Sequence, residues 1–188
     1  MQSPFFILEI NQFEFIFVVG EKKTEDFEFN ILYKVNVPIN NIDKNNIINV
    51  QNSLEKLKEN IFLIEKKFKR TFKEIIILID DFNITYNNIS GFIKLNGSQL
   101  DKKNITYILN SLKSSIDEHE NKYILHIFNS KFCLDKKQLE NLPIGLFGDF
   151  YTHELSFSLI NKNDYKNLEN IFKKCNLRIN KIILKSFI

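Results

Sequence analysis

The sequence feature that most constrains the fold is a cluster of turn residues directly before a long alternating segment, in residues 139–160 (LENLPIGLFGDFYTHELSFSLI). The chain has only 5 glycines and 3 prolines, yet Pro143, Gly145 and Gly148 lie close together here. Proline fixes one backbone angle, and glycine reaches conformations that a Cβ disfavours. From residue 150 onward apolar and polar side chains alternate, which predicts a strand with one buried face. We therefore expect a constrained connector that leads into this strand.

Hydrophobic periodicity predicts the remaining elements. Strands are expected at residues 5–10, 13–19, 27–37, 74–79, 89–95, 123–128, 132–134 and 181–185. Helices are expected at residues 50–68, 101–116 and 163–175. Asn11-Gln12 predicts a two-residue turn between the first two strands, because asparagine tolerates the left-handed conformation. The run 74–79 is continuous and β-branched, which suits a central strand covered on both faces. The order is β-β-β-α-β, then an inserted segment, then α-β.

Composition and charge exclude several classes of protein. The hydrophobic fraction of 44% allows a real core, and the net charge is only +3. The densest basic run, residues 65–73, is interpreted as a solvated helix face, with a nucleic-acid patch as the alternative. No apolar run is long enough to span a membrane, and no signal peptide is recognised. Cys133 and Cys175 form no CxxC pair, so we expect reduced thiols in a cytoplasmic protein.

The titratable side chains form no recognisable active site. The three histidines are not at metal-ligand spacing relative to one another or to the cysteines. His126 is expected to be a hydrogen-bonded structural residue, and Asp135 a solvated one. Asp80-Asp81 ends a strand, where a turn acid is favoured over a paired-carboxylate site. No P-loop, nucleophile elbow or GxGxxG motif is present. We therefore expect neither a metal site nor enzyme activity.

Several motifs occur in an order and spacing that match one known family. They are Glu74–Ile79, Ile89-Ser90-Gly91-Phe92, Leu125-His126, Pro143-Ile144-Gly145-Leu146-Phe147-Gly148, Ser158-Leu159-Ile160 and Lys174-Cys175-Asn176-Leu177. In this respect the chain resembles FtsA, the bacterial cell-division family of the actin-like ATPase superfamily. The resemblance covers essentially the whole chain and is strongest over residues 123–185.

The resemblance implies an α+β fold with two parts. Residues 4–85 and 162–188 would form an actin-like subdomain (1A), related to ribonuclease H, and residues 86–161 an inserted SHS2-like domain (1C). It also implies protein–protein recruitment at the division site, with division proteins or a second protomer bound through the insert. The candidate partner-binding residues are Pro143, Gly145, Leu146, Phe147 and Gly148. The protein would then reach the inner face of the cell membrane through its partners, without a membrane segment or nucleic-acid partner of its own.

The same resemblance bears on nucleotide binding. In FtsA the turn between the first two strands reads Asp-Ile-Gly-Thr-Ser and contacts the ATP phosphates and Mg²⁺. The matching residues here are Glu9-Ile10-Asn11-Gln12-Phe13, in which the glycine and both hydroxyls are gone. Glu9, Asn11 and Gln12 thus form a degenerate phosphate turn, and we expect no ATP or Mg²⁺ cofactor in this chain.

Other interpretations remain open. FtsZ is expected as a partner only if the family's C-terminal half follows Ile188, because FtsZ docking and the membrane helix of FtsA belong to that half. A type IV pilus assembly protein of the PilM kind shares the actin-like architecture and would also bind a partner. A stand-alone SHS2-type adaptor would keep only the role of the insert.

Overall fold

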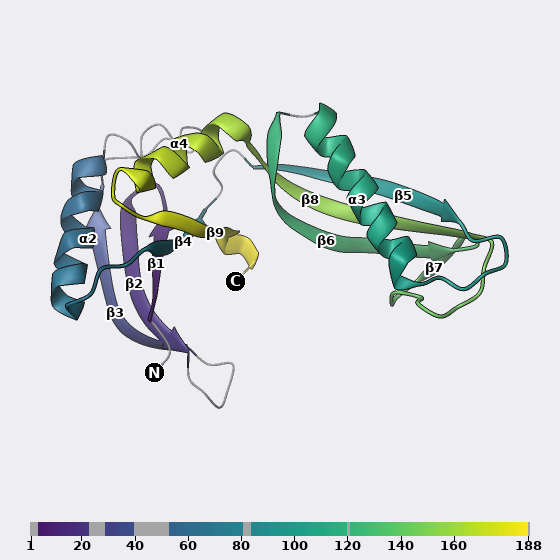
Figure 1. Cartoon of the computed structure of the whole chain (residues 1–188), viewed down its shortest axis with the longest axis horizontal. Coiled ribbons are helices and arrows are strands. Elements are labelled where there is room, and N and C mark those ends of the chain that lie inside the picture. Colours follow the sequence, from purple (N-terminus) through teal and green to yellow (C-terminus); the bar gives the residue numbers. More distant parts are fainter. Residues whose placement is uncertain (1–3, 23–28, 40–52, 81–83, 120, 188) are drawn as a thin grey trace. The chain divides into compact units, whose positions relative to one another are not determined.

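The computed structural model describes residues 4–22, 29–39, 53–80, 84–119 and 121–187 of the chain (Figure 1). The chain divides into two compact units. The first unit comprises residues 1–83 and 163–188, and the second comprises residues 84–162. The second unit is thus inserted in the sequence of the first.

The first unit is built on a five-stranded sheet with the order β3-β2-β1-β4-β9. Its strands are β1 (Phe5–Ile10), β2 (Glu14–Lys22), β3 (Phe29–Pro38), β4 (Glu74–Ile79) and β9 (Arg178–Leu184). The first three form an antiparallel meander, whereas β4 is parallel to both β1 and β9. Parallel neighbours need a crossover. The crossovers contain α2 (Leu54–Phe68) before β4 and α4 (Lys162–Lys173) before β9, and a 3₁₀ turn, η1 (Lys185–Phe187), follows β9.

The core of the first unit follows from the alternation along its strands. In β4, Ile75, Ile77 and Ile79 are buried, whereas the residues between them are only half-buried. Leu57, Ile61 and Ile64 of α2 and Leu168, Ile171 and Phe172 of α4 complete this core. The expectation that β4 is covered on both faces is therefore wrong for the described residues, because only alternate side chains of this strand are fully buried.

The second unit is a four-stranded antiparallel sheet with one helix. The order is β5-β8-β6-β7. The elements are β5 (Thr85–Lys94), α3 (Lys102–His119), β6 (Lys122–Leu134), β7 (Lys137–Leu139) and β8 (Phe150–Asn161). Tyr151, Leu155, Phe157 and Leu159 of β8 are buried in one cluster with Ile108, Leu112 and Ile116 of α3. The alternation in the sequence therefore does produce a strand with one buried face.

Two strands of the second unit are longer than the sequence pattern indicates. β5 begins at Thr85 rather than Ile89, because the polar residues 85–88 pair with Ser156–Leu159 of β8. The predicted strands 123–128 and 132–134 are one strand, β6, whose pairing with β8 shifts register twice. Such irregularities break the alternation that periodicity arguments rely on. The expected N-cap is confirmed, since Asp101 Oδ1 accepts a hydrogen bond of 2.8 Å from the Asn104 N–H.

Candidate functional site

The connection between β1 and β2 lies at the carboxyl end of β1 and contains three residues, Asn11 to Phe13. The Asn11 Oδ1 atom accepts hydrogen bonds from the backbone N–H groups of Phe13 and Glu14, each 2.9 Å long. Asn11 does not adopt a left-handed conformation. The predicted two-residue turn is therefore wrong, because three residues connect the strands. The side chain of Asn11 adds its two bonds to the backbone bond of 3.3 Å from Asn11 N–H to Glu14 O.

This arrangement does not fit a nucleotide phosphate. A phosphate needs free backbone N–H donors, and the N–H groups of Phe13 and Glu14 already bind Asn11. Glu9 Oε1 lies 2.6 Å from Lys185 Nζ, and its hydrogen bond raises the pKa of Lys185. The carboxylate of Glu9, which would have to contact Mg²⁺ in a phosphate turn, is thus paired with a lysine instead. Gln12 is half-buried and Phe13 is 65% exposed on this turn.

The connector between β7 and β8 has a tightly held backbone. It runs antiparallel to residues 95–100, which lead from β5 to α3, and the two segments exchange backbone hydrogen bonds. These are Gly145 N–H to Leu100 O (2.9 Å), Leu100 N–H to Leu146 O (2.9 Å), Gly148 N–H to Ser98 O (3.3 Å), Gly97 N–H to Gly148 O (3.0 Å) and Leu95 N–H to Asp149 O (2.7 Å). The connector is therefore part of the fixed structure of the second unit.

The two glycines of the connector act in different ways. Gly145 has a φ of +89°, a conformation that residues with a Cβ resist, as expected. Gly148 has no positive φ, so the same explanation is wrong for it. A Cβ at Gly148 would lie 2.6 Å from Leu134 Cδ1 and 2.9 Å from Asp135 Oδ2. Glycine is needed at position 148 because its neighbours leave no room for a side chain. Pro143 of the same connector is also buried.

Asp135 holds the start of β8 in place. Its carboxylate Oδ1 accepts hydrogen bonds of 2.8 Å from the backbone N–H groups of both Asp149 and Phe150. Asp135 and Lys136 both have positive φ and form the two-residue turn between β6 and β7. Asp135 is exposed, as predicted, and its carboxylate also binds the backbone at the start of β8. An aspartate in a two-residue hairpin turn was the available signal, but the N–H groups that donate to it begin 14 residues further along the chain.

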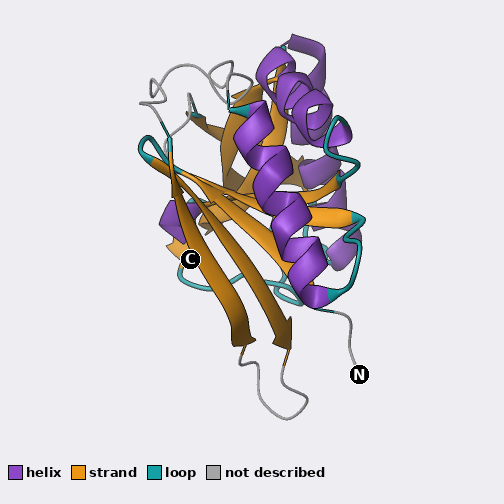
Figure 2. Cartoon of the chain, turned by 90° about the vertical axis from the view of Figure 1, so that its left-hand side faces the viewer, coloured by secondary structure: helices purple, strands orange, loops and turns teal. Residues whose placement is uncertain are grey.

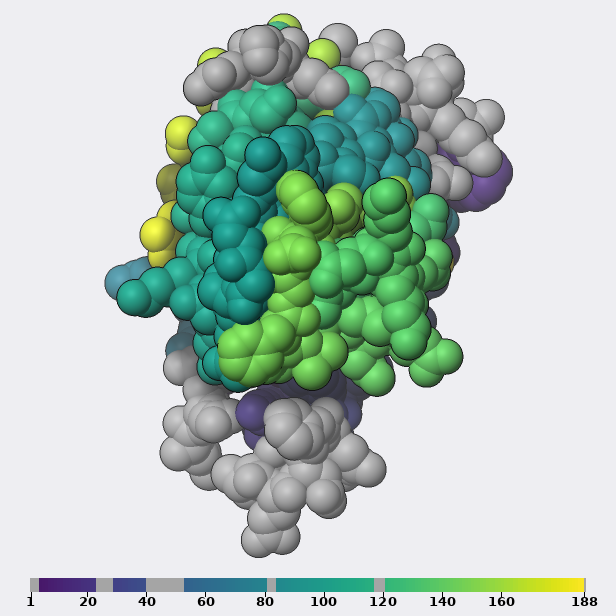
Figure 3. Space-filling model, turned by 90° about the vertical axis from the view of Figure 1, so that its right-hand side faces the viewer, coloured from purple at the N-terminus to yellow at the C-terminus, as the bar shows by residue number. Residues whose placement is uncertain are grey.

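Three apolar side chains of the connector and the first side chain of β8 are exposed, whereas Leu142 packs against the core of the second unit. We define the connector patch as Ile144, Leu146, Phe147 and Phe150, which are 44%, 51%, 70% and 50% exposed. Figure 3 shows this end of the second unit, with the light green connector between the teal segment around residue 95 and the darker green β6–β7 hairpin. Leu146 and Phe147 of the predicted partner-binding residues are thus accessible, whereas Pro143 and Gly148 are buried.

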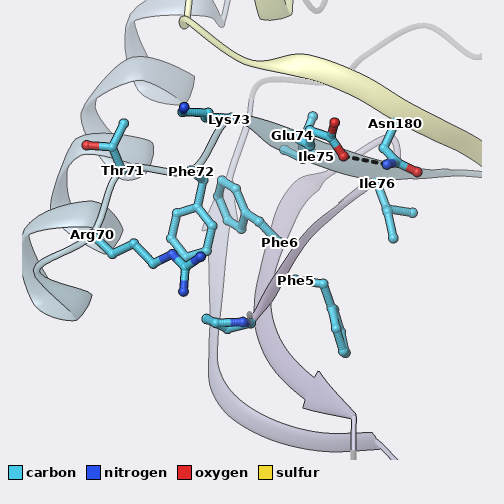
Figure 4. Close-up of a pocket in the computed structure, with 11 residues that line it drawn as sticks. Phe5, Phe6, Arg70, Thr71, Phe72, Lys73, Glu74, Ile75, Ile76 and Asn180 are labelled. Carbon is cyan, nitrogen blue, oxygen red and sulfur yellow. Dashed lines mark hydrogen bonds between the residues drawn. The ribbon is translucent and has the colours of Figure 1, made fainter. Parts of the chain in front are cut away.

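A cleft of about 570 Å³ opens in the first unit, at the amino ends of β1, β4 and β9 (Figure 4). The rings of Phe6 and Phe72 lie side by side in it, with centroids 4.8 Å apart. Hydrogen bonds from Arg178 and then Asn180 lower the pKa of Glu74, the carboxylate of this cleft. Ligands of open α/β sheets bind at the carboxyl ends of strands. This cleft lies at the amino ends, opposite the β1–β2 turn, and is therefore not in the usual ligand position.

A buried histidine that the sequence analysis did not single out lies in β8. His153 is 2% exposed, and its Nε2 lies 3.0 Å from Asn129 Oδ1. Its Nδ1 and the hydroxyl of Tyr151 are buried without a hydrogen-bond partner among the described residues. Burial lowers the pKa of His153 and raises that of Tyr151. His126 contacts Phe128, with ring centroids 5.8 Å apart.

The described part of the chain contains neither a metal-binding cluster nor a membrane-spanning helix. No group of three or more histidine, cysteine, aspartate or glutamate side chains comes together there as a metal site. Asp81 lies outside the described residues, so the paired-carboxylate alternative at Asp80-Asp81 stays untested. No helix in the described ranges is both long enough and apolar enough to cross a membrane.

No protein-family model matches the sequence, and no curated protein matches it. Among solved structures, a chain of the PilM-PilN type IV pilus biogenesis complex superposes with a TM-score of 0.60 and 10% sequence identity. The match covers 100% of this chain and 49% of that chain, so the protein spans about half the length of its neighbour. At this identity, the likeness concerns the fold alone.

A second neighbour is a protein of Bacteroides thetaiotaomicron VPI-5482 with an actin-like ATPase fold and unknown function. It aligns over 97% of this chain and 52% of that chain, at 12% identity and a TM-score of 0.35, which is too low to carry an argument. The neighbour from the PilM-PilN complex supports the expected α+β fold. The narrower assignments to FtsA and to an SHS2-like insert stay predictions.

Proposed function

We propose that the protein recruits partner proteins during the assembly of a bacterial machine at the cell membrane, without nucleotide turnover in this chain. The observation that carries the proposal is the connector patch, in which four large apolar side chains lie exposed on a fixed backbone. Large exposed apolar groups on a preorganised loop are typical of protein-binding sites, because little conformational entropy is lost on binding.

The geometry of the β1–β2 turn supports the absence of nucleotide turnover. Asn11 binds the N–H groups that a phosphate would need, and Glu9 pairs with Lys185. The chain then acts as an adaptor in the cytoplasm, held at the inner face of the membrane by its partners.

Cell division is the first candidate process, because the connector motif and its sequence context resemble FtsA. The partners would be division proteins or a second protomer bound through the second unit, with FtsZ added if a further half of the protein exists. Pilus assembly is the second candidate, favoured by the structural likeness to a chain of the PilM–PilN complex. A stand-alone SHS2-type adaptor would use the same patch.

A photo-crosslinking amino acid at position 147 tests the proposal in cells of the source organism. p-Benzoylphenylalanine at Phe147 is expected to form an adduct with a division protein or with a second copy of the chain. The matched control replaces Tyr107 of α3, another aromatic residue, which is 63% exposed. An adduct with a pilus-assembly protein would favour pilus assembly over cell division as the process. No adduct at 147 above the level at 107 would refute recruitment through the patch.

Calorimetric titration with ATP and Mg²⁺ tests the nucleotide part separately. The protein is expected to give no saturable heat, because the donors of its phosphate turn are already bonded. The double variant Asn11→Gly, Phe13→Ser restores two features of the family turn and serves as the comparison. Saturable binding of ATP by the unmodified chain would contradict this part of the proposal.

A further inference from the structure

The C-terminal half of α2 carries two exposed apolar side chains beside a group of cations. Phe62 and Leu63 are 61% and 53% exposed. Because residues three and four apart are neighbours on a helix, they lie next to Lys66 and Lys67. We define the α2 surface as the exposed residues Glu59, Phe62, Leu63, Lys66, Lys67 and Lys69.

The α2 surface is net positive, because Lys66, Lys67 and Lys69 outnumber its one acid, Glu59, which lies three and four residues before Phe62 and Leu63. Residues 62–73 contain five lysines and arginines and one acid, Glu65. Glu65 is half-buried, and its Oε1 accepts a hydrogen bond of 2.8 Å from the backbone N–H of Phe72. The acid therefore serves the α2–β4 connection. The N-terminal half of the helix differs, since Glu55 lies 3.6 Å from Lys58 and the charges there alternate.

The fold of the first unit does not account for the apolar part of this surface. The buried face of α2 consists of Leu57, Ile61 and Ile64, which already anchor the helix to the core. Lysines near a helix C-terminus are favoured by the helix dipole, which explains Lys66 and Lys67 but not Phe62 and Leu63. In Figure 2, α2 is the long helix nearest the viewer, so its outer side faces away from the described sheet.

We propose that the α2 surface binds directly to membranes that contain anionic phospholipids. The combination of exposed aromatic and aliphatic side chains with flanking lysines is that of an interfacial helix, whose apolar groups enter the headgroup boundary while its cations bind lipid phosphates. Each lysine or arginine near such a surface strengthens binding about fivefold. This contact lies in the first unit and is independent of the connector patch.

A bilayer fits this surface better than a nucleic acid does. Single-stranded nucleic acids are bound by aromatic stacking platforms in a basic groove, and double helices by cations with polar side chains. Leu63 has no role in either mode, yet it shares the centre of the surface with Phe62. Insertion of both into a lipid boundary uses them and the surrounding cations together.

Vesicle flotation tests the proposal with the full chain. Phosphatidylcholine vesicles with about one-third phosphatidylglycerol are expected to bind the protein, whereas phosphatidylcholine alone is not. The variant Lys66→Gln, Lys69→Gln is expected to weaken binding about 30-fold, and Phe62→Ser about tenfold. Lys67 is left in place because its Nζ lies 3.7 Å from the centre of the Tyr33 ring. The matched controls are Lys102→Gln, Lys103→Gln and Tyr107→Ser on α3, all exposed.

A tryptophan reporter gives an independent readout. The chain contains no tryptophan, so Phe62→Trp introduces a single fluorophore into the surface. Its emission is expected to shift to the blue with anionic vesicles, while that of Tyr107→Trp stays unchanged. Absence of vesicle binding, or binding that the α3 controls weaken as much as the α2 variants do, would overturn the proposal. Binding of a DNA duplex without vesicle binding would replace it with the nucleic-acid interpretation.

Discussion

The β1–β2 turn and the connector are both short segments with internally bonded backbones, but they use their side chains in opposite ways. In the turn, the side chain of Asn11 satisfies two backbone N–H groups of its own segment. In the connector, backbone carbonyls and the carboxylate of Asp135 satisfy the N–H groups instead. The side chains of Ile144, Leu146 and Phe147 are exposed on this backbone. The hydrogen-bond acceptors therefore come from a side chain of the segment itself in the turn, and from the backbone and a neighbouring hairpin in the connector.

The largest effect is expected where the connector packs most closely. Gly148→Val is expected to lower the free energy of unfolding of the second unit by about 3 kcal/mol, because the new side chain meets Leu134 and Asp135. Gly97→Ala is the control, since its Cβ meets nothing within 4 Å and only its positive φ costs about 1 kcal/mol. Hydrogen exchange of the β8 amides measures the free energy of unfolding of both variants. Equal effects would show that packing at Gly148 does not hold the connector.

Removal of the acceptor is the next test of the comparison. Asp135→Gly keeps the left-handed turn but leaves the N–H groups of Asp149 and Phe150 without their carboxylate, and is expected to cost about 2 kcal/mol. Lys136→Gly, at the adjacent position with a φ of 68°, is expected to be nearly neutral. Urea unfolding of both variants gives the difference. If the two variants have the same stability, the connector is fixed by its other bonds alone.

The stability of the second unit is expected to fall on acidification. Burial holds the pKa of His153 below its unfolded value, so the unfolded state binds more protons as the pH decreases. The contribution of neutral His153 is therefore present above about pH 6.5 and lost below it. Hydrogen exchange of β8 from neutral to mildly acidic pH measures the change. His153→Gln should reduce this dependence and His126→Gln should not; the reverse result would assign it to His126.

The smallest effect is expected in the β1–β2 turn. Asn11→Ala removes one side-chain acceptor from a partly exposed turn, and is expected to lower the free energy of unfolding of the first unit by about 1 kcal/mol. Gln12→Ala is the control and is expected to change it by less than about 0.5 kcal/mol. Hydrogen exchange of the β1 amides, recorded during thermal unfolding, compares the stabilities of the two variants. A neutral Asn11→Ala variant would show that the bonds of Asn11 are not needed for the turn.

Part of the candidate site followed from residue types alone. Gly145 was predicted to need an unusual conformation, and its φ of +89° confirms it. The degenerate phosphate turn stays a prediction; the structure shows that the side chain of Asn11 binds the backbone there. The bond from Asp135 and the packing of Gly148 could not be predicted, because in each case the partner lies in another segment of the chain.

By itself, the sequence determined the local elements of this protein. Alternation over residues 150–160 and the spacing of Leu57, Ile61 and Ile64 are properties of neighbouring residues, and they produced β8 and the buried face of α2. Only the tertiary structure decided that polar residues 85–88 extend a strand, that His153 is buried, and that Phe62 remains exposed. The physical reason is that strand pairing and burial depend on which distant segment of the chain lies against a residue. Hydrophobic periodicity carries no information about that segment.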